Sequence, residues 1–156
     1  MRVVSPSLKR LVQAYEVRGV LEAGAARLAA NGGTEAEKHT IMDAAARSLS
    51  AAEFGDREGF ASWDGIFHRE IAAATKNPRL AVLVENALSL TRVLRQRDFP
   101  AKTDTTKCGT QHVAIANAIL MGNPVDAAMK AAQHADDVQQ MVLKLANLRG
   151  SEFVKG

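Results

Sequence analysis

Apolar residues recur along this chain at intervals of three and four, the spacing that places them on one face of an α-helix. Alanine is abundant, and the alternation of β-branched residues that a strand needs is nearly absent. The pattern predicts six helices, over 8–30, 34–54, 58–76 and 78–97, then one between the polar stretch 102–107 and the turn at 122–124, and one over 125–148. The predicted fold class is therefore all-α, an antiparallel bundle of about six helices joined by short loops.

Local signals mark several of these boundaries. Residues 31–33, Asn-Gly-Gly, are typical of a helix C-terminus. Thr34 followed by Glu37 matches a capping box, in which each side chain bonds the backbone N–H of the other residue. Asn77 stands before Pro78, an N-cap followed by proline at the first helical position. These signals predict where the second and fourth helices begin.

The chain has 156 residues, a length that suits one domain burying roughly 70% of the surface of its unfolded chain. Residues 1–7 are interpreted as the remnant of a linker. The peptide at 150–153, Gly-Ser-Glu-Phe, is one that two adjacent cloning sites would encode, so 150–156 is interpreted as a tail. We expect residues 8–149 to form the single domain, with a central cavity for a metal or ligand.

The charge of this chain argues against direct binding to nucleic acid. Twenty Lys and Arg stand against 17 Asp and Glu, a formal charge of +3, but the basic residues are scattered among acids. One Trp and one Tyr leave little on which bases could stack. We expect no DNA binding by this chain alone.

Cysteine content and hydropathy limit the cellular setting. Cys108 is the single cysteine, which excludes an internal disulfide and a CxxC metal site. No apolar run approaches the ~18 residues of a membrane span, and the first ten residues lack the apolar core of a signal peptide. We therefore expect a cytoplasmic protein with no membrane partner.

Three of the four histidines share helix faces with apolar residues. His68 lies four residues after Asp64 on the third predicted helix, whereas His112 and His134 lie on the fifth and sixth. Each could be an ordinary core histidine, and Asp64 could pair with a core arginine. Together, however, three imidazoles and one carboxylate converging inside a bundle would supply the ligands of a metal ion. His39 lies in a polar run and is expected to be solvated.

Arginines are the candidate groups for binding an anion. Arg18 lies on the apolar face of the first helix, where its guanidinium needs a negative partner. That partner is either Glu22, four residues on, or a ligand. Arg92 and Arg95 flank the apolar stripe of the fourth helix, with Arg95 nearer to it, and either could be a surface charge or a pocket residue.

A catalytic constellation is not evident. The sequence has no nucleophile elbow and no glycine-rich phosphate loop. Cys108 precedes His112 by one helical turn, but on a helix in a bundle it is expected to pack as a small hydrophobe. We therefore predict a protein that is not an enzyme. The alternative is a helical-bundle metal-dependent hydrolase, because an open metal site can activate water.

Four segments and one histidine resemble a known family. They are 15–30, 64–71, 75–80 and 111–119, together with His134. They are similar to the FCD domain, the C-terminal effector-binding domain of FadR-type regulators in the GntR family of transcription factors. The ordered set of Asp-x3-His, a second His, and a third His 22 residues later is the most specific part of the resemblance.

The resemblance implies a ligand-sensing domain with a metal in the centre of an all-α bundle. The implied metal ligands are Asp64, His68, His112 and His134. Nitrogen and oxygen ligands of this kind suit zinc first, with nickel, manganese or iron as alternatives. The implied guest is a small carboxylate effector, contacted by Arg18 first and then by Arg95 and Arg92.

The same resemblance implies a homodimer whose effector modulates binding to DNA. In the family, DNA is bound by an N-terminal winged helix-turn-helix, which this chain does not contain. We therefore expect this chain to bind the effector but not operator DNA. One departure from the family lies beside the second histidine, where Gln111 stands in place of the usual Glu.

Overall fold

The computed structural model describes the backbone of residues 6–98 and 105–152, and the side chains of 8–96 and 105–146. This part of the chain forms six helices and no strand, which confirms the all-α prediction. The helices are α1 (Pro6–Gly32), α2 (Glu35–Glu53), α3 (Arg57–Ala74), α4 (Pro78–Asp98), α5 (Thr106–Leu120) and α6 (Pro124–Glu152).

The predicted helix boundaries are close to the observed ones, with differences at the two ends of the chain and before α5. Helix α1 begins at Pro6, inside the segment interpreted as a linker, because proline is well suited to a first helical turn. Helix α6 continues past 148 to Glu152, since no proline follows to stop it. Helix α5 begins at Thr106, so the end of the stretch 102–107 is helical. Residues 1–5, 102–104 and 153–156 of these predicted segments lie outside the described part.

The predicted caps are present. The Thr34 hydroxyl accepts a hydrogen bond from the Glu37 N–H at 3.2 Å, and the Glu37 carboxylate accepts one from the Thr34 N–H at 2.8 Å. Asn77 Oδ1 accepts a hydrogen bond from the Leu80 N–H at 3.2 Å, which caps α4. These side chains satisfy N–H groups that a helix leaves free at its start.

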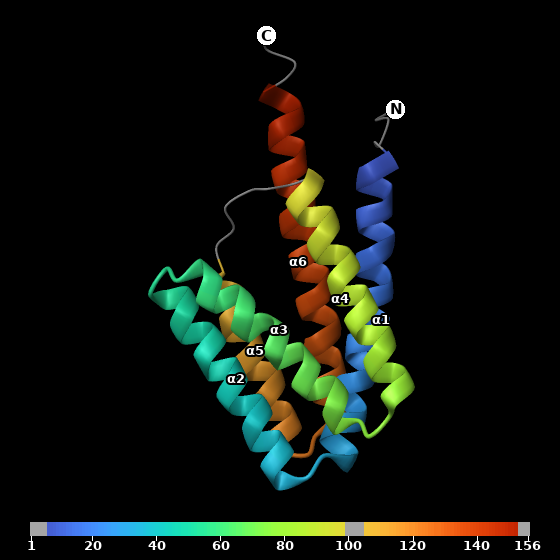
Figure 1. The fold of residues 1–156 in the computed structure, drawn as a ribbon, viewed down its shortest axis with the longest axis vertical. Helices are drawn as coiled ribbons and strands as arrows, with labels where there is room; N and C mark the ends of the chain where they lie inside the picture. The colour runs from blue at the N-terminus through green and yellow to red at the C-terminus, as the bar shows by residue number, and fades with distance from the viewer. Residues whose placement is uncertain (1–5, 99–104, 153–156) are drawn as a thin grey trace.

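The six helices form two groups (Figure 1). Helix α1 packs against α6 and α4 in one group, and α2 packs against α3 and α5 in the other. Contacts of α5 with α6, of α3 with α4, and of α1 with both α3 and α5 join the two groups. None of the described helices combines the length and apolar content needed to cross a membrane.

The interior contains two apolar clusters separated by a polar layer. The larger cluster includes Ala26, Phe67, Ile71, Ile115 and Ile119. The smaller cluster includes Leu11, Tyr15, Leu94, Cys108 and Val138. Between them, five helices present polar side chains, and these are Arg18 and Glu22 on α1, Asp64 and His68 on α3, Thr91 on α4, His112 on α5 and His134 on α6. This polar layer is where the predicted site residues meet.

A glycine sets the distance between α5 and α2. A Cβ atom at Gly109 would lie only 2.7 Å from the Leu49 Cα, so no larger residue fits without moving the helices apart. His112 lies one turn further along α5, and Ser48 precedes Leu49 on α2. The close approach at Gly109 therefore brings the His112 ring beside Ser48.

Candidate metal centre

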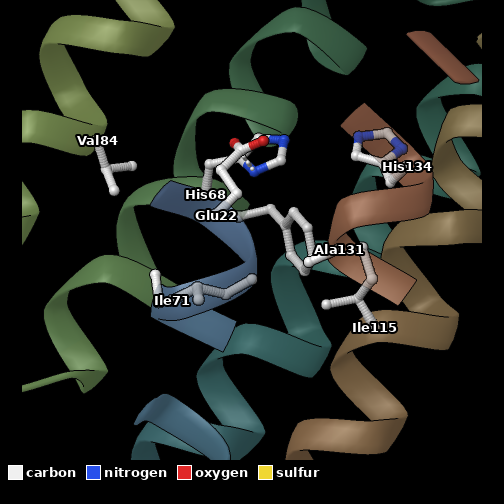
Figure 2. Close-up of a pocket in the computed structure, with 9 residues that line it drawn as sticks. Glu22, His68, Ile71, Val84, Ile115, Ala131 and His134 are labelled. Carbon is white, nitrogen blue, oxygen red and sulfur yellow. Dashed lines mark ion pairs between the residues drawn. The ribbon is translucent and has the colours of Figure 1, made fainter. Parts of the chain in front are cut away.

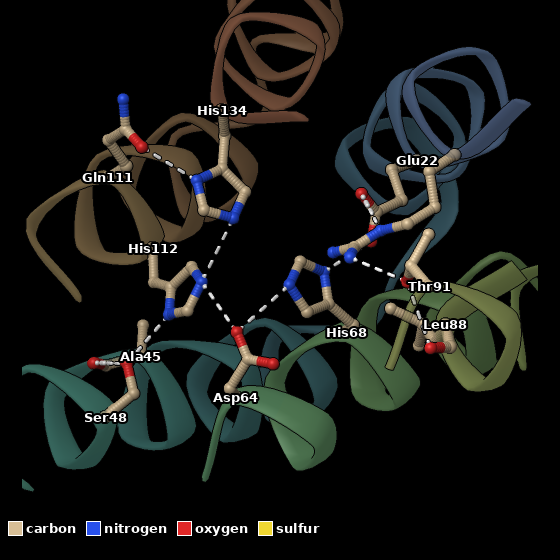
Figure 3. A network of polar contacts seen from close by, with 11 residues as sticks. Glu22, Ala45, Ser48, Asp64, His68, Leu88, Thr91, Gln111, His112 and His134 are labelled. Carbon is tan, nitrogen blue, oxygen red and sulfur yellow. Dashed lines mark hydrogen bonds and ion pairs between the residues drawn. The ribbon is translucent and has the colours of Figure 1, made fainter. Parts of the chain in front are cut away.

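The structure brings together the four residues predicted as metal ligands (Figure 3). His68, His112 and His134 are buried, with at most 4% of their surface exposed. Asp64 reaches the same point from α3, but its side chain keeps 31% of its surface exposed. The site is therefore closed by protein around the rings and reachable beside Asp64.

One nitrogen of each ring faces a common centre. The Nε2 atoms of His112 and His134 are 3.3 Å apart. Asp64 Oδ1 lies 3.3 Å from His112 Nε2 and 3.5 Å from His68 Nε2. Ligand atoms of the three histidines all lie within 4.8 Å of one another.

The other nitrogen of each ring has a partner that determines its protonation. His68 Nδ1 lies 2.8 Å from Glu22 Oε1, and His134 Nδ1 lies 2.8 Å from Gln111 Oε1. Both oxygens only accept hydrogen bonds, so each Nδ1 carries a proton. The Gln111 orientation follows from its amide nitrogen, which donates to Asp137 at 2.6 Å.

His112 is oriented in the same way by a hydroxyl. Its Nδ1 lies 2.9 Å from Ser48 Oγ, which donates its own proton to the Ala45 carbonyl at 2.7 Å. Towards His112 the hydroxyl oxygen can therefore act only as an acceptor, so the proton is on His112 Nδ1. In a neutral imidazole with a proton on Nδ1, Nε2 is a bare acceptor. The neutral rings of His112 and His134 thus direct lone pairs at the same centre, together with a carboxylate oxygen, and His68 directs its Nε2 atom there.

The pKa values agree with a site built for positive charge. Burial lowers the pKa of His112 and, further, that of His134, which keeps both rings neutral. Burial acts in the same direction on His68, but the carboxylates of Glu22 and Asp64 raise the pKa of that ring to about 9. The His68 and His112 rings hold the pKa of Asp64 well below its usual range against the effect of burial.

These donors fit a divalent metal ion. Four ligands about 2.0–2.1 Å from a tetrahedral ion are about 3.3–3.4 Å apart, close to the separations between the Asp64 oxygen and the nearest ring nitrogens. His68 Nε2 is buried and has no hydrogen-bond partner among the described residues, which is what a metal-ligating nitrogen shows when no metal is bound. Nδ1–H groups bound to carboxylate, hydroxyl and amide oxygens are the usual supports of histidine ligands.

Arg18 is buried and pairs with Glu22, which was one of its two predicted partners. Its Nε and one terminal nitrogen each lie 3.3 Å from a Glu22 oxygen, and the other terminal nitrogen donates to Thr91 at 3.1 Å. Glu22 in turn contacts His68, so Arg18 supports the metal centre indirectly. Arg18 and His68 together hold the pKa of Glu22 far below its ordinary value despite burial.

The remaining predicted residues lie around this centre. Arg95 is half-buried and lies close to the Tyr15 hydroxyl, whereas Arg92 is exposed and places its guanidinium near Gly65. Their contact with an effector stays a prediction. Cys108 packs in the smaller apolar cluster and His39 is exposed, as expected for both.

Sequence reasoning missed two supporting groups, Ser48 and Thr91, and the second role of Glu22. Ser48 orients His112, Thr91 holds Arg18, and Glu22 orients His68 as well as pairing with Arg18. Ser48 and Thr91 lie on inward faces of their helices, which is the signal that could have indicated them. Hydroxyls are common on such faces because they can bond the helix's own carbonyls, and this makes the signal weak.

A cavity of about 10 Å³ lies beside the His68 and His134 rings (Figure 2). Its remaining lining consists of Glu22 and apolar side chains, among them Phe67 and Ile115. Such a volume holds about one water molecule. An organic acid therefore has no space on this side of the rings in the structure as it stands.

Two comparisons relate the chain to known proteins. The family model described as the FCD domain matches residues 13–137. The chain is also 33% identical over 138 residues to the HTH-type transcriptional regulator LutR of Bacillus subtilis (strain 168), an alignment that covers 83% of this chain. It covers 61% of LutR, so the chain spans about three fifths of that relative's length.

Proposed function

The chain belongs to the FCD domain family, and from this membership we propose that it senses a small organic acid through a bound divalent metal ion. The observation that carries the proposal is the convergence of three histidine side chains and the Asp64 oxygen on one point. Without a cation the lone pairs on the Nε2 atoms of His112 and His134, which are 3.3 Å apart, repel each other. The proposed ligands are Asp64, His68, His112 and His134, and the proposed metal is zinc, with nickel, manganese or iron as alternatives.

The charges of the polar layer favour an anionic guest. Arg18 and Glu22 neutralise each other, and Asp64 balances half the charge of a divalent ion. One positive charge stays uncompensated in a layer from which water is largely excluded, where electrostatic attraction is strong. A bound ion supplies that charge and coordination positions for an anionic oxygen. Arg95, Arg92 and the remaining N–H groups of Arg18 are the proposed protein contacts of the acid.

Binding fits these residues better than hydrolysis does. A metal-dependent hydrolase needs a general base within reach of its water. Among the described carboxylates of the polar layer, Glu22 is paired with Arg18 and His68, and Asp64 is a proposed ligand. We therefore propose a sensor, not an enzyme. By analogy with the HTH-type relative LutR, the bound acid modulates DNA binding by a helix-turn-helix domain outside this chain, in the cytoplasm.

Metal removal tests the proposal. Because the ion binds the folded chain only, one equivalent of zinc is expected to raise the melting temperature of the chelator-treated protein by at least about 5 °C. Native mass spectrometry is expected to show one metal per chain, and acetate or succinate is expected to add a further thermal shift only when metal is bound. Equal melting temperatures with and without metal would contradict the proposal, and acid shifts that persist in chelator would contradict its metal-dependent part.

An exposed apolar strip on α1 and α4 supports the proposal of a homodimer. The strip consists of Val17, Val20, Val82, Leu83, Leu90 and Val93, all more than half exposed. Helices α1 and α4 are in contact, so the strip lies on two neighbouring helices. Apolar patches of this kind mark protein interfaces. We propose that a second copy of the chain covers this strip.

The double variant Val20→Glu/Leu90→Glu is expected to be monomeric where the wild type is a dimer. Burying unpaired carboxylates in an apolar interface is costly, so the dimer dissociation constant is expected to rise at least about 100-fold. Light scattering coupled to size exclusion measures this. Met129→Glu is the matched control, because Met129 is also more than half exposed but lies on α6, which contributes no residue to the strip. A monomeric wild type, or a dimeric double variant, would show that this strip is not the interface.

A further inference from the structure

The His134 ring differs from the other two rings in the kind of group that faces its Nδ1 atom. His68 faces a carboxylate, which only accepts hydrogen bonds, and His112 faces the Ser48 hydroxyl, whose proton is donated to a carbonyl. His134 faces the side-chain amide of Gln111, with 2.8 Å between Nδ1 and the amide oxygen. An amide has an acceptor oxygen at one position and N–H donors at the other, so its two orientations have opposite effects on a ring.

The orientation of the Gln111 amide decides which nitrogen of the neutral His134 ring carries the proton. Figure 3 shows the amide oxygen directed at the ring, so Nδ1 carries the proton and Nε2 presents a lone pair to the metal centre. With the amide turned over, an N–H group would donate to Nδ1, and the ring would keep its proton on Nε2 instead. A protonated nitrogen cannot bind a metal ion. The ring is therefore a ligand in only one orientation of the amide.

Asp137 holds the amide in the orientation that metal binding needs. It lies three residues after His134 on α6, and its Oδ2 atom accepts a hydrogen bond from the Gln111 amide nitrogen at 2.6 Å. If the amide turned over, its oxygen would face the carboxylate at this distance. Two acceptors with no proton between them repel each other, so the carboxylate excludes the turned orientation.

Three donors hold the Asp137 carboxylate in place. Besides the bond from Gln111, it accepts one from Gln133 Nε2 at 2.9 Å and pairs with Lys107 at 3.3 Å. Burial acts to raise the pKa of this carboxyl, but these hydrogen bonds lower the pKa on balance, so the group stays ionised and only accepts. Its side chain is 23% exposed and lines a groove of about 590 Å³ between α5 and α6. One amide thus links a partly exposed carboxylate to a buried ring.

Building on the proposed metal site, we propose that Asp137 is a positioning residue for the metal centre, fixing the Gln111 amide and through it the tautomer of His134. The two residues act as a unit, because Gln111 supplies the acceptor and Asp137 determines its direction. A carboxylate at position 111 would not need this control, since both of its oxygens accept. The amide at this position makes metal binding depend on a carboxylate that is not itself a ligand.

Asp137→Ala tests this with two measurements. In the metal-free protein labelled with nitrogen-15, the ring nitrogen chemical shifts are expected to show His134 protonated on Nδ1 in the wild type, and divided between Nδ1 and Nε2 in the variant. Zinc affinity, measured by competition with a chromophoric chelator, is expected to fall about 3- to 10-fold, less than the 10–100-fold typical of removing an orienting group outright. The loss is smaller because Gln111 remains and can still turn its oxygen toward the ring.

Gln111→Glu in the Asp137→Ala background separates positioning from structural support. The new carboxylate accepts from His134 Nδ1 in either orientation but restores none of the contacts of Asp137. Zinc affinity is therefore expected to return at least to within about 2-fold of the wild type. Asp136→Ala is the matched control, because it removes the same charge from the neighbouring, exposed position of α6. It should leave the tautomer unchanged and the zinc affinity within about 2-fold.

Each contrary outcome has a defined meaning. If zinc binds but Asp137→Ala keeps the single tautomer or the wild-type affinity, the inference is overturned and the proposed function stands. The same holds if Asp136→Ala causes an equal loss, which would indicate an effect of charge alone, or if Gln111→Glu fails to restore the affinity, which would indicate a structural role. If the wild type binds no metal ion, the metal-dependent part of the proposed function fails and the inference fails with it.

Discussion

His112→Ala is expected to abolish metal binding, lowering zinc affinity at least about 100-fold. His112 holds the central position of the site, because its Nε2 lies 3.3 Å from both His134 Nε2 and Asp64 Oδ1. Loss of a group that only orients a ligand typically costs 10–100-fold in metal affinity, and loss of the ligand itself should cost more. The remaining donors would lose the atom that links His134 to Asp64.

Metal content by elemental analysis and zinc affinity by competition with a chromophoric chelator measure this effect. The His112 ring stacks with Phe60 and with Phe67, so the alanine variant also leaves a cavity, and its helical content must be checked by circular dichroism. His134→Gln, a milder change at a second ligand, is expected to show the same loss. His39→Ala is the control, since His39 is exposed and far from the site in sequence. One zinc per chain in both ligand variants would refute the site.

Glu22→Gln is expected to destabilise the metal-free protein by about 3 kcal/mol, because it leaves the buried Arg18 guanidinium without a counter-charge. Glu22 contacts Arg18 at 3.3 Å and His68 at 2.8 Å, so one carboxylate supports two buried cationic groups. For a domain of this size, that loss corresponds to a fall in melting temperature of roughly 6–12 °C. Zinc affinity is also expected to fall about 10-fold or more, since His68 loses its charged orienting partner.

Urea unfolding in the presence of a chelator measures the stability of both proteins without a contribution from metal. Asp43→Asn is the matched control. Asp43 and Arg47 form an ion pair with the same spacing of four residues and a shorter distance of 2.8 Å, but both side chains are more than half exposed. Exposed pairs contribute little, so this variant should change stability by less than about 0.5 kcal/mol. Equal losses of unfolding free energy in the two variants would show that the buried pair stabilises the protein no more than the exposed pair does.

The sequence predicted the helices well because their signals are local. The spacing of apolar residues indicates a helix wherever it persists, and Asn77 with Pro78 marks a start that the structure confirms. Prediction was less accurate at the C-terminus of α6. The helix continues to Glu152, beyond the predicted end, and Gly150, a residue type common at helix ends, lies inside it.

The sequence predicted the candidate metal ligands but not most of the side chains that orient them. Asp64 and the three histidines were recognised as polar residues on apolar faces, which a sequence displays directly. Ser48 and Thr91 carry no comparable signal, because a hydroxyl on an inward face needs no partner outside its own helix. Gln111 was noted as a departure from the family, and the structure shows that its amide oxygen bonds His134.

The sequence by itself determined the fold class, the inward face of each helix and the set of candidate ligands, since helical periodicity and capping depend on residues close together in the chain. Only the tertiary structure decided that the polar residues of five helices lie at one level between two apolar clusters. That level depends on how far each helix slides and rotates against its neighbours. Packing sets both, as at Gly109, where α5 approaches α2. The same packing brings each histidine Nδ1 atom to its partner and leaves the strip on α1 and α4 exposed.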